Sequence, residues 1–523
     1  MFAAVYGMSV EGLTAHLVRV EVDISNGLPG FEVVGLAATA VREAKDRVRS
    51  ALKNSGFQFP LQRITVNLAP ADLRKEGSGL DLPIAVGILA ALGEVDPAKI
   101  RNHLFVGELS LEGTLRPVPG ILTMAVGITN LKKSPTSLQD SFTEFSLTEN
   151  NIMVVPPANL AEARLVPDIQ SESVENLQQL IQVLNNKTGF TVEPLISSEP
   201  DQEEPPVDWS DIRGQAQAKR ALEIAATGGH NLLMIGPPGS GKTLLARAFA
   251  GILPPLTSEE SLEVTQLYSS AGLFSAKGTL ITRRPFRSPH HNATVAAVIG
   301  GGQKLRPGEL VLANHGVLFL DELPEFSREV LESLRQPLED RKFTLIRQRG
   351  AIEYPARVSV LAGMNPCPCG FYGDNGKQCT CTPWQVHNYR NRVSGPLLDR
   401  FDLQIEVPRL SYSELKEARD YESSSIVRER VIRNRQKQWQ RFGNSRTNAE
   451  MTSRETKEIC VLDSSSEALL KKVFDQNFYS ARAYDRILRV ARTIADMADS
   501  EQIKIEHLAE SLQYRALDRE LKL

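Results

Sequence analysis

A glycine-rich run near the middle of the chain has residue types and spacing suited to phosphate chemistry. Its residues are Gly236, Pro237, Pro238, Gly239, Ser240, Gly241, Lys242 and Thr243, and Leu244 opens a helical segment. In the spacing G-x-x-x-x-G-K-T, the glycines let backbone N–H groups face phosphate oxygens, and the following helix adds the positive end of its dipole. The lysine reaches the β- and γ-phosphates, and the threonine hydroxyl ligates Mg²⁺. The run predicts a nucleoside triphosphate site with bound Mg²⁺; the alternative is a plain Gly-Pro turn before a helix.

Two acidic residues follow a second apolar run. Gly316–Leu320 has the composition of a buried strand, and Asp321 and Glu322 come directly after it. An acid at the carboxyl end of a buried strand beside a P-loop is placed to hold Mg²⁺, and the next acid is placed to orient an attacking water. We therefore expect Asp321 to bind the metal and Glu322 to act on water.

Four of the five cysteines lie within fifteen residues. They are Cys367, Cys369, Cys379 and Cys381, while Cys460 stands alone. Four thiolates can hold one tetrahedral zinc, and the Gly-rich interval between the pairs can form a turn that brings them together. The spacing departs from the usual C-x-x-C, so reduced free thiols and a redox disulfide remain alternatives. A four-cysteine site leaves no open coordination position, which favours a structural role.

The elements that must position these residues fall into four predicted regions. Residues 1–185 alternate strand-like and helix-like patterns and form an α/β domain, and residues 186–208 are a Pro-rich acidic linker. Residues 209–408 form a second α/β region around the glycine-rich run. Residues 409–523 are mainly helical.

In the first domain, Leu17–Ile24 and Arg63–Leu68 are predicted strands. Ala38–Ser55 is a predicted amphipathic helix, and the almost wholly apolar Leu82–Leu92 is a predicted buried helix. Lys132–Asn151 is polar and serine-rich and is predicted to be a surface loop.

In the second half, Asp340–Tyr354 is a predicted β-hairpin with Gly350 at or near its turn. The C-terminal region contains four predicted helices, which span Glu414–Arg441, Ser464–Asn477, Ala483–Met497 and Ile505–Leu521.

Composition narrows the class of protein. The 523 residues are 41% apolar and 24% charged with a net charge of −3, as in a soluble globular protein. The chain has no overall basic excess of the kind that indicates a nucleic-acid partner. Any contacts with nucleic acid would therefore depend on local basic patches. The N-terminus lacks a basic n-region, no run is long enough to span a membrane, and the cysteine pattern is not a disulfide framework. We therefore expect a cytoplasmic protein with no membrane contact.

Several tracts together resemble one family. Gly236–Thr243 with Leu318–Glu322 resembles an AAA+ ATPase, and further tracts narrow the match to the magnesium-chelatase-like AAA+ family. Those tracts are Arg287–Thr294, Pro307–Leu310, Leu334–Glu339 and Met364–Gly370. The resemblance covers essentially the whole chain and implies ATP with Mg²⁺ as ligands.

The resemblance also implies roles for residues outside the glycine-rich run. Asn365, after an apolar strand, resembles a sensor of the γ-phosphate. Arg400, in Leu397–Leu403, resembles an arginine finger that acts on a neighbouring subunit and therefore implies a ring. Arg482 resembles a second sensor, although Arg486 and Arg489 compete for that role. A solvated surface charge is the alternative for each arginine.

By resemblance, the hairpin at 340–354 would project into the channel of a ring and contact DNA. Arg341, Lys342, Arg347 and Arg349 would then meet phosphates. The alternatives are a solvated hairpin or a subunit interface. The basic segment Arg428–Arg441 contains Trp439, so it could be a nucleic-acid face or a solvated helix with Trp439 in the core. The adjacent His290 and His291 are expected to point to different sides and to be structural.

The N-terminal domain resembles the S5-like α/β fold of Lon proteases, which use a Ser–Lys pair. The serine position is Leu80 here, and the lysine position near Gly120–Ala125 has no basic residue. Ser78 is two residues away with no evident base. Protease activity is therefore not expected, and the resemblance implies an N-terminal S5-like domain, a central AAA+ P-loop core and a C-terminal helical lid.

Within the family, the competence proteins imply an ATP-dependent motor that acts on single-stranded and branched DNA. Such a protein would assemble as a homo-hexamer with ATP and DNA, with helicase or branch-migration activity during natural transformation. Alternatives are a metal-insertion or protein-remodelling ATPase, a DNA-binding ATPase without unwinding activity and an ATP-dependent protease.

Overall fold

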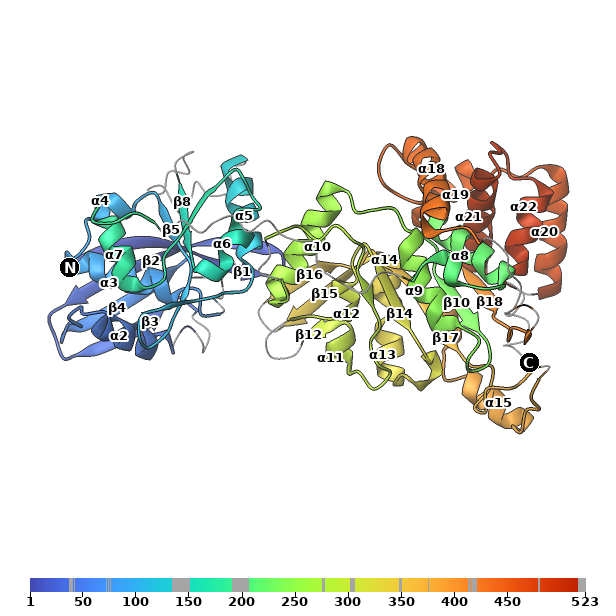
Figure 1. Ribbon diagram of the computed structural model, residues 1–523, viewed down its shortest axis with the longest axis horizontal. Helices are drawn as coiled ribbons and strands as arrows, with labels where there is room; N and C mark the ends of the chain where they lie inside the picture. Colours follow the sequence, from blue (N-terminus) through green and yellow to red (C-terminus); the bar gives the residue numbers. More distant parts are fainter. Residues whose placement is uncertain are drawn as a thin grey trace. The chain divides into compact units, whose positions relative to one another are not determined.

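The computed structural model shows a mixed α/β protein with two compact units (Figure 1). The first contains Met1–Asp201 and Ser261–Ile281, and the second contains Gln202–Glu260 and Thr282–Leu523. The residues that the structure describes are 1–36, 41, 43–71, 73, 75, 77–133, 151–190, 207–274, 278–301, 306–347, 350–374, 376–412, 414, 421–477 and 480–515.

The first unit is built on a seven-stranded sheet with the order β3-β4-β2-β1-β5-β8-β9. Strands β1, β2 and β4 pair antiparallel, and the remaining neighbours pair in parallel. The strands span Phe2–Glu11 (β1), Thr14–Ser25 (β2), Gly30–Val34 (β3), Arg63–Ala69 (β4), His103–Phe105 (β5), Ile152–Val155 (β8) and Gln170–Ser173 (β9), and Glu108–Leu109 (β6) and Leu115–Arg116 (β7) form a separate ribbon.

Alternating side chains place one core on each face of this sheet. In β1, Val5 belongs to the core with helices α2, α3 and α7, and Tyr6 belongs to the core with α5 and α6. This is the expected result of the two-residue period of a strand. The helices span Ala44–Asn54 (α2), Asp81–Ala91 (α3), Pro97–Ile100 (α4), Ile121–Lys133 (α5), Pro157–Ala163 (α6) and Leu177–Leu184 (α7).

The second unit contains a parallel sheet with the order β11-β14-β17-β10-β18. Because all five strands run the same way, their carboxyl ends meet at one edge. The strands span Leu232–Ile235 (β10), Phe286–Arg287 (β11), Val317–Leu320 (β14), Ser359–Met364 (β17) and Leu403–Glu406 (β18).

Both faces of this sheet are buried, which explains its almost continuously apolar strands. Leu232 and Met234 of β10 pack with α8, α9 and α18 (Ser424–Phe442), while Leu233 and Ile235 pack in the opposite core with α11, α12 and α13. The elements around the sheet span Trp209–Asp211 (η2), Ala216–Gly228 (α8), Lys242–Ile252 (α9), Val295–Val298 (α11), Glu309–Leu312 (α12), Leu323–Glu325 (η3), Arg328–Ser333 (α13), Arg335–Asp340 (α14), Pro383–Arg390 (α15) and Gly395–Leu398 (α16).

Two short ribbons accompany the sheet. Gly300–Gly301 (β12) pairs with Arg306–Pro307 (β13), and Lys342–Arg347 (β15) pairs antiparallel with Gly350–Pro355 (β16). The second ribbon confirms the hairpin predicted at 340–354.

Helix α10 (Ser258–Ala271) follows α9 in the chain, but Ser261–Ile281 belongs to the first unit. There, Ser269 and Ser270 contact Glu162 and Thr123 through hydroxyl hydrogen bonds, and Leu262 packs in the α5–α6 core. Part of the segment between Lys242 and Asp321 therefore completes the first unit.

The C-terminal region is helical, as predicted. Its elements span Ser424–Phe442 (α18), Asn448–Glu450 (η4), Ser453–Ile459 (α19), Ser464–Asn477 (α20), Ala481–Met497 (α21) and Ile505–Gln513 (α22). Val427 and Val431 of α18 pack with the sheet core, whereas α19 to α22 share a smaller core around Leu488 and Leu508. None of the described helices combines the length and apolar character that a membrane crossing requires.

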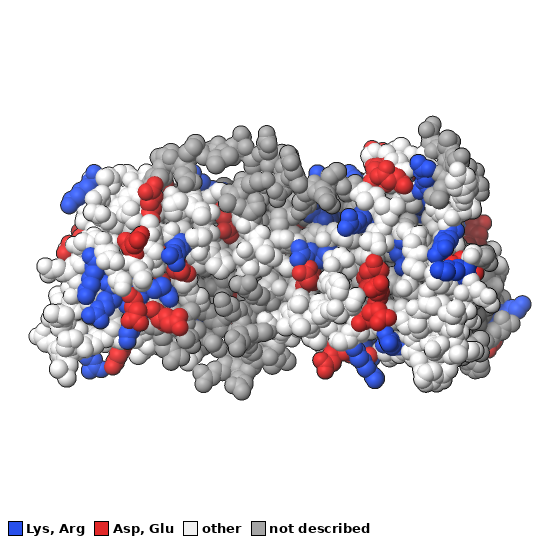
Figure 2. Space-filling view, turned by 60° about the horizontal axis from the view of Figure 1, so that its bottom comes forward, with Lys and Arg blue, Asp and Glu red and all other residues white. Residues whose placement is uncertain are grey.

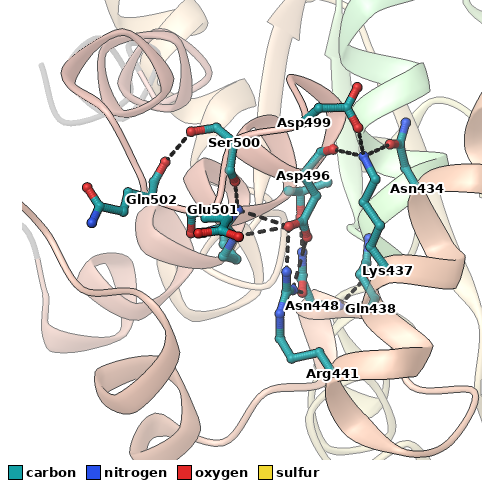
Figure 3. Close-up of polar contacts among 12 residues, drawn as sticks. Asn434, Lys437, Gln438, Arg441, Asn448, Asp496, Asp499, Ser500, Glu501 and Gln502 are labelled. Carbon is teal, nitrogen blue, oxygen red and sulfur yellow. Dashed lines mark hydrogen bonds and ion pairs between the residues drawn. The ribbon is translucent and has the colours of Figure 1, made fainter.

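A buried carboxylate ties the C-terminal helices together (Figure 3). Asp496 of α21 is 2% exposed and accepts hydrogen bonds from Arg441 of α18, Asn448 of η4 and Arg492 of its own helix, at 2.5 to 3.1 Å. Lys437 of α18 adds a bond to the Asp496 carbonyl. Three elements thus share one acceptor, which fixes α18 and η4 relative to α21.

The predicted elements agree with the structure in most places. Strands 17–24 and 63–68, helix 82–92 and helix 464–477 are confirmed to within a few residues at each end. The helix predicted over 414–441 begins only at Ser424, and the helix predicted over 505–521 ends at Gln513, since Tyr514 and Arg515 form a turn. Residues 516–521 lie outside the described residues. Residues 38–40 and 42 of the predicted helix 38–55, residues 134–150 of the predicted loop and residues 191–206 of the predicted linker lie outside the described residues. Lys132 and Lys133 of the predicted loop belong to α5.

Replacement of Asp496 with Ala should destabilise the C-terminal helices. Arg492 is 4% exposed and would lose its carboxylate, so we expect the free energy of unfolding to fall by about 3–5 kcal/mol. Urea unfolding followed by circular dichroism measures this change. Asp499→Ala is the matched control: Asp499 is 73% exposed and pairs with Lys437, so the loss should stay below about 1 kcal/mol. Equal losses in the two variants would contradict the role of Asp496.

Candidate nucleotide site

The glycine-rich run forms the loop between β10 and α9, as its pattern predicts. Gly239 and Gly241 have φ values of +79° and +93°, which favour glycine. A Cβ at Gly236 would lie 2.2 Å from the Val407 carbonyl oxygen, so the residue directly after β18 approaches this loop too closely for any side chain. Leu244 lies in the first turn of α9 and is 40% exposed.

Lys242 is held at this edge by neutral oxygens. It is 8% exposed, and its Nζ donates to the carbonyls of Gly236 (2.8 Å) and Pro237 (3.1 Å) and to Asn365 Oδ1 (3.3 Å). Burial lowers the pKa of Lys242, an effect that the charges of Asp321 and Glu322 partly oppose. A phosphate at this position would supply negative charge in direct contact with the ammonium group.

The two residues predicted to ligate Mg²⁺ lie side by side. Thr243 Oγ1 donates to Asp321 Oδ2 at 2.9 Å, and Asp321 follows β14 directly. A Cβ at Gly363 of β17 would lie 2.9 Å from Asp321 Oδ1, so the absence of a side chain there makes room for the carboxylate. A hydroxyl and a carboxylate oxygen are hard ligands of the kind that Mg²⁺ prefers.

Glu322 is exposed, has a left-handed backbone (φ +53°) and contacts a histidine that the sequence did not connect with it. His291 Nδ1 lies 3.3 Å from Glu322 Oε2. The ring centroids of His290 and His291 are 4.1 Å apart, so the expectation that they point to different sides is wrong. That expectation assumed an extended strand, whereas both residues lie in a loop after Pro289.

Arg400 and Arg482 lie together rather than with Lys242. Arg400, 6% exposed, donates to the Pro396 carbonyl at 2.8 Å and forms an ion pair with Glu339 of α14. Arg482 of α21 is 59% exposed and lies 3.4 Å from the same carboxylate. Among the described residues, neither arginine forms an ion pair or hydrogen bond with the loop at 236–243.

The two competing arginines have other partners. Arg486 lies 3.7 Å from Asp402, and Arg489 donates to Thr456 Oγ1 at 3.2 Å. Of the three candidates, Arg482 is therefore the one that is mostly exposed.

The residues predicted to contact DNA lie near the base of the hairpin or beyond what the structure describes. Arg341 ends α14 in a left-handed conformation and forms an ion pair with Glu450 of η4 at 3.1 Å. Lys342 pairs with Glu353 across the hairpin at 2.9 Å. Arg347 ends β15, the structure does not describe its side chain, and Arg349 lies outside the described residues.

The basic helix α18 uses most of its cations internally. Arg428 donates to the Gly251 carbonyl, Arg430 pairs with Glu223 and Glu422, and Arg441 pairs with Asp496. Trp439 is half-buried. These contacts favour a structural helix over a nucleic-acid face. On the face drawn in Figure 2, Lys and Arg side chains of the described residues are interspersed with Asp and Glu.

The four clustered cysteines converge beside the nucleotide loop. Their sulfur atoms lie within 4.8 Å of one another, and Cys367, Cys369 and Cys379 are 3.3 to 3.7 Å apart. A tetrahedral site with Zn–S bonds of about 2.3 Å has sulfur atoms roughly 3.8 Å apart, so the arrangement fits zinc. A Cβ at Gly370 would lie 2.6 Å from Pro238 Cδ, which shows how tightly the cysteine loop packs on residues 236–243.

The first unit lacks the arrangement of a Ser–Lys protease among its described residues. Leu80 is 1% exposed in the core, and Ser78 donates to the Glu108 carboxylate. Lys75, close to Ser78 in sequence, donates to the carbonyls of Gly35, Leu68 and Pro70. A charged lysine bound by carbonyl oxygens is not available as a base for Ser78.

Comparisons with known proteins cover nearly the whole chain. Family models described as "Magnesium chelatase, subunit ChlI", "Subunit ChlI of Mg-chelatase" and "Magnesium chelatase, subunit ChlI C-terminal" match residues 208–415, 20–136 and 421–515. The competence protein ComM of Haemophilus influenzae is 44% identical over 99% of this chain and 98% of its own. The chain belongs to the magnesium-chelatase-like family.

Relatives in this family differ in their identity to this chain and in the share of it that they cover. The uncharacterized protein YifB of Salmonella typhimurium is 44% identical over 99% of this chain and 97% of its own. The magnesium-chelatase 38 kDa subunit of Cereibacter sphaeroides is 25% identical over 39% of this chain and 59% of its own. The family is related to AAA+ ATPases, in agreement with the nucleotide-loop geometry.

We expect one zinc ion per chain, because four thiolates at tetrahedral spacing are a complete zinc site. Metal analysis of freshly reduced protein should give about one equivalent, and Cys379→Ser should lower it severalfold. Cys460→Ala is the control, since Cys460 is buried outside the cluster and should leave the zinc content unchanged. Protein that folds without metal and contains four titratable thiols in the cluster would contradict this assignment.

Proposed function

We propose that this protein is an ATP-hydrolysing motor of the AAA+ type. The observation that carries the proposal is the convergence of Lys242, Thr243, Asp321 and Asn365 at one edge of a parallel sheet, with Glu322 adjacent. Its architecture would be an S5-like N-terminal domain, an AAA+ core and a helical lid.

Each residue of the group has a role in the proposal. Lys242 binds the β- and γ-phosphates, Thr243 and Asp321 hold Mg²⁺, and Asn365 senses the γ-phosphate. Glu322 orients the attacking water, and the loop at 236–244 cradles the phosphates. A Mg²⁺ ion held by Thr243 and Asp321 would neutralise the charge that develops on the phosphate oxygens. The direct bond from Thr243 to Asp321 supports the pairing of these two as ligands.

Arg400 would act in trans on the ATP of a neighbouring subunit, within a homo-hexamer that forms on ATP and DNA. Its present contacts to Glu339 and the Pro396 carbonyl mean that this action requires the side chain to leave Glu339. Arg482 would then report the nucleotide to the lid.

DNA is the proposed substrate of the motor, in single-stranded and branched form. This proposal is supported by the name of a relative with 44% identity, which is a competence protein. Competence concerns the uptake of DNA. We infer a cytoplasmic helicase or branch-migration activity on recombination intermediates during natural transformation. The hairpin residues Arg341, Lys342, Arg347 and Arg349 are the proposed DNA contacts.

A metal-insertion motor is the second candidate. It is favoured by the magnesium-chelatase model that matches residues 208–415. The weaker similarity to the 38 kDa subunit, which covers 39% of this chain, makes it the second choice. ATP turnover stimulated by DNA would separate the first candidate from the second.

The central test measures ATP binding, ATP hydrolysis and DNA strand displacement in matched variants. Lys242→Ala should abolish ATP binding, because it removes the phosphate contact, and Glu322→Gln should preserve binding but reduce turnover by about 10²-fold or more. Strand displacement on a labelled mobile DNA junction should occur with wild type and ATP, and with neither variant.

The outcomes of this test are distinct. Normal hydrolysis in either variant would overturn the nucleotide site. A wild type that hydrolyses ATP without displacing strands, and whose turnover ignores DNA, would retain the site but reject the DNA motor.

The contact between His291 and Glu322 predicts a second kinetic effect. His291→Ala should lower kcat for ATP about five- to tenfold with little change in KM, because the carboxylate loses the partner that orients it. His290→Ala is the control and should change kcat by less than about twofold. Equal effects in both variants would show that the loop as a whole matters, not the His291 contact.

A further inference from the structure

A cavity of about 640 Å³ lies in the second unit, away from the nucleotide loop. Gly229, Gly316 and Ser359 line it, and these residues lie at or just before the beginnings of β10, β14 and β17. The nucleotide loop follows the end of β10, so the cavity opens at the opposite edge of the same sheet. Small-molecule sites have volumes of about 300–1,000 Å³, and this cavity falls in that range.

Cationic side chains dominate the lining, together with several hydroxyl and amide groups. The cations are Arg284, Arg341, Lys342, Arg357, Arg435 and Arg446, and the four acids are Glu260, Asp340, Glu353 and Glu450. Asn444, Ser445 and Thr447 add neutral hydrogen-bonding groups. The lining comes from the sheet, the hairpin base and the C-terminal region.

Four of the six cations are balanced by carboxylates. Arg284 pairs with Glu260 at 2.9 Å, Arg341 with Glu450 at 3.1 Å and Lys342 with Glu353 at 2.9 Å. Arg446 pairs with Glu455 at 2.8 Å. His315 also lies 3.3 Å from Glu260, and its hydrogen bond and the charge of Arg284 outweigh burial and lower the pKa of Glu260 to about 2.

Arg435 and Arg357 are the two lining cations outside these ion pairs, and Asp340 is the one lining acid outside them, so the lining keeps a net positive charge. Arg435 is 8% exposed, and its Nε and Nη2 both donate to a single acceptor, the Ala226 carbonyl, at 2.9 and 2.6 Å. Arg357 is exposed. Within the described residues neither guanidinium has a carboxylate partner.

The environment of Arg435 makes its charge unfavourable. Burial and then the charge of Arg284 lower its pKa from the usual guanidinium value. A guanidinium stays protonated in proteins, so the positive charge is retained at a cost in free energy. An anion that entered the cavity would relieve this cost.

The walls that carry these groups are rigidly held. Asp496 binds Arg441 of α18 and Asn448 of η4 (Figure 3), and these two elements carry Arg435 and Glu450. Thr447 and Asn448 adjoin each other, and Asn448 N–H donates to Gln438 of α18 at 2.8 Å. The basic groups are therefore held in fixed positions, as a binding site requires.

We propose that this cavity is a second phosphate-binding site, which takes a phosphate-bearing anion of nucleotide size or a phosphate of a DNA backbone. Guanidinium groups bind phosphate through paired hydrogen bonds, and the hydroxyl of Ser445 adds a donor that suits phosphate oxygens. The Thr447 hydroxyl already donates to Glu450 Oε2 at 3.2 Å. The site involves none of the residues assigned to ATP. It contains Arg341 and Lys342 of the proposed DNA contacts, so a DNA phosphate as its ligand rests on the proposed function.

The test uses the full-length chain with Lys242→Ala, which disables the nucleotide loop. Pyrophosphate binding by calorimetry and binding of a fluorescent twelve-nucleotide single strand by anisotropy are measured in low salt. Arg357→Gln and Arg435→Gln, added singly, should each weaken binding about tenfold, as expected for loss of a charge-assisted bond. The Arg357 side chain is exposed and forms no ion pair among the described residues, so its replacement tests the site without a folding defect.

Arg454→Gln is the matched control, because Arg454 is 87% exposed, pairs with Glu458 and does not line the cavity. It should bind both probes as the parent does. Weakened pyrophosphate binding supports a free phosphate ligand, and weakened strand binding alone supports a DNA phosphate. If the parent binds neither probe, or if both cavity variants bind like Arg454→Gln, the proposal is overturned. ATP binding by the chain with an intact Lys242 reports on the proposed function separately.

Discussion

Close backbone approach at the carboxyl edge of the second sheet is the constraint on which the candidate site depends. Gly236 lies against the Val407 carbonyl, Gly363 leaves room for Asp321, and Gly370 packs on Pro238. Each contact is too short for a side chain. Together they bring the nucleotide loop, the acidic strand end and the cysteine loop into one layer, where Lys242, Asp321 and Asn365 can share a ligand.

The close packing at this edge of the sheet implies a structural role for the cysteine cluster. The loop from Cys367 to Cys381 begins two residues after Asn365, and its fold decides where Gly370 meets Pro238. A metal that holds four thiolates fixes that loop without requiring a large apolar core. Zinc would thus support the phosphate loop from outside, although it takes no part in phosphate chemistry.

Much of the fold was accessible from the sequence because local pattern and tertiary structure agree. The apolar run at β10, the glycine spacing after it and the buried helix α3 have periods and compositions that leave few alternatives. The sequence also predicts that the glycine-rich loop and the acidic strand end lie together, because each is a short, contiguous tract, and the structure brings the two tracts to one edge of the sheet.

Contacts between segments that are distant in the sequence could not be predicted from local patterns. The sequence does not show that His291 reaches Glu322, or that Glu339 holds Arg400 and Arg482. It also does not show that Ser261–Ile281 belongs to the first unit, or that the cations of α18 turn inward. Each depends on where distant segments meet, and a single charged residue has the same local pattern whether it is solvated or paired.

The shared carboxylate of Glu339 has a mechanical consequence. Glu339 lies in the last turn of α14, and the chain passes through Arg341 directly into β15 of the hairpin. A load on the hairpin would therefore be transmitted along α14 to Glu339. Because one carboxylate contacts two arginines, the same displacement would loosen Arg400 and Arg482 together, so that a single side chain would couple the hairpin to Arg400 and to helix α21.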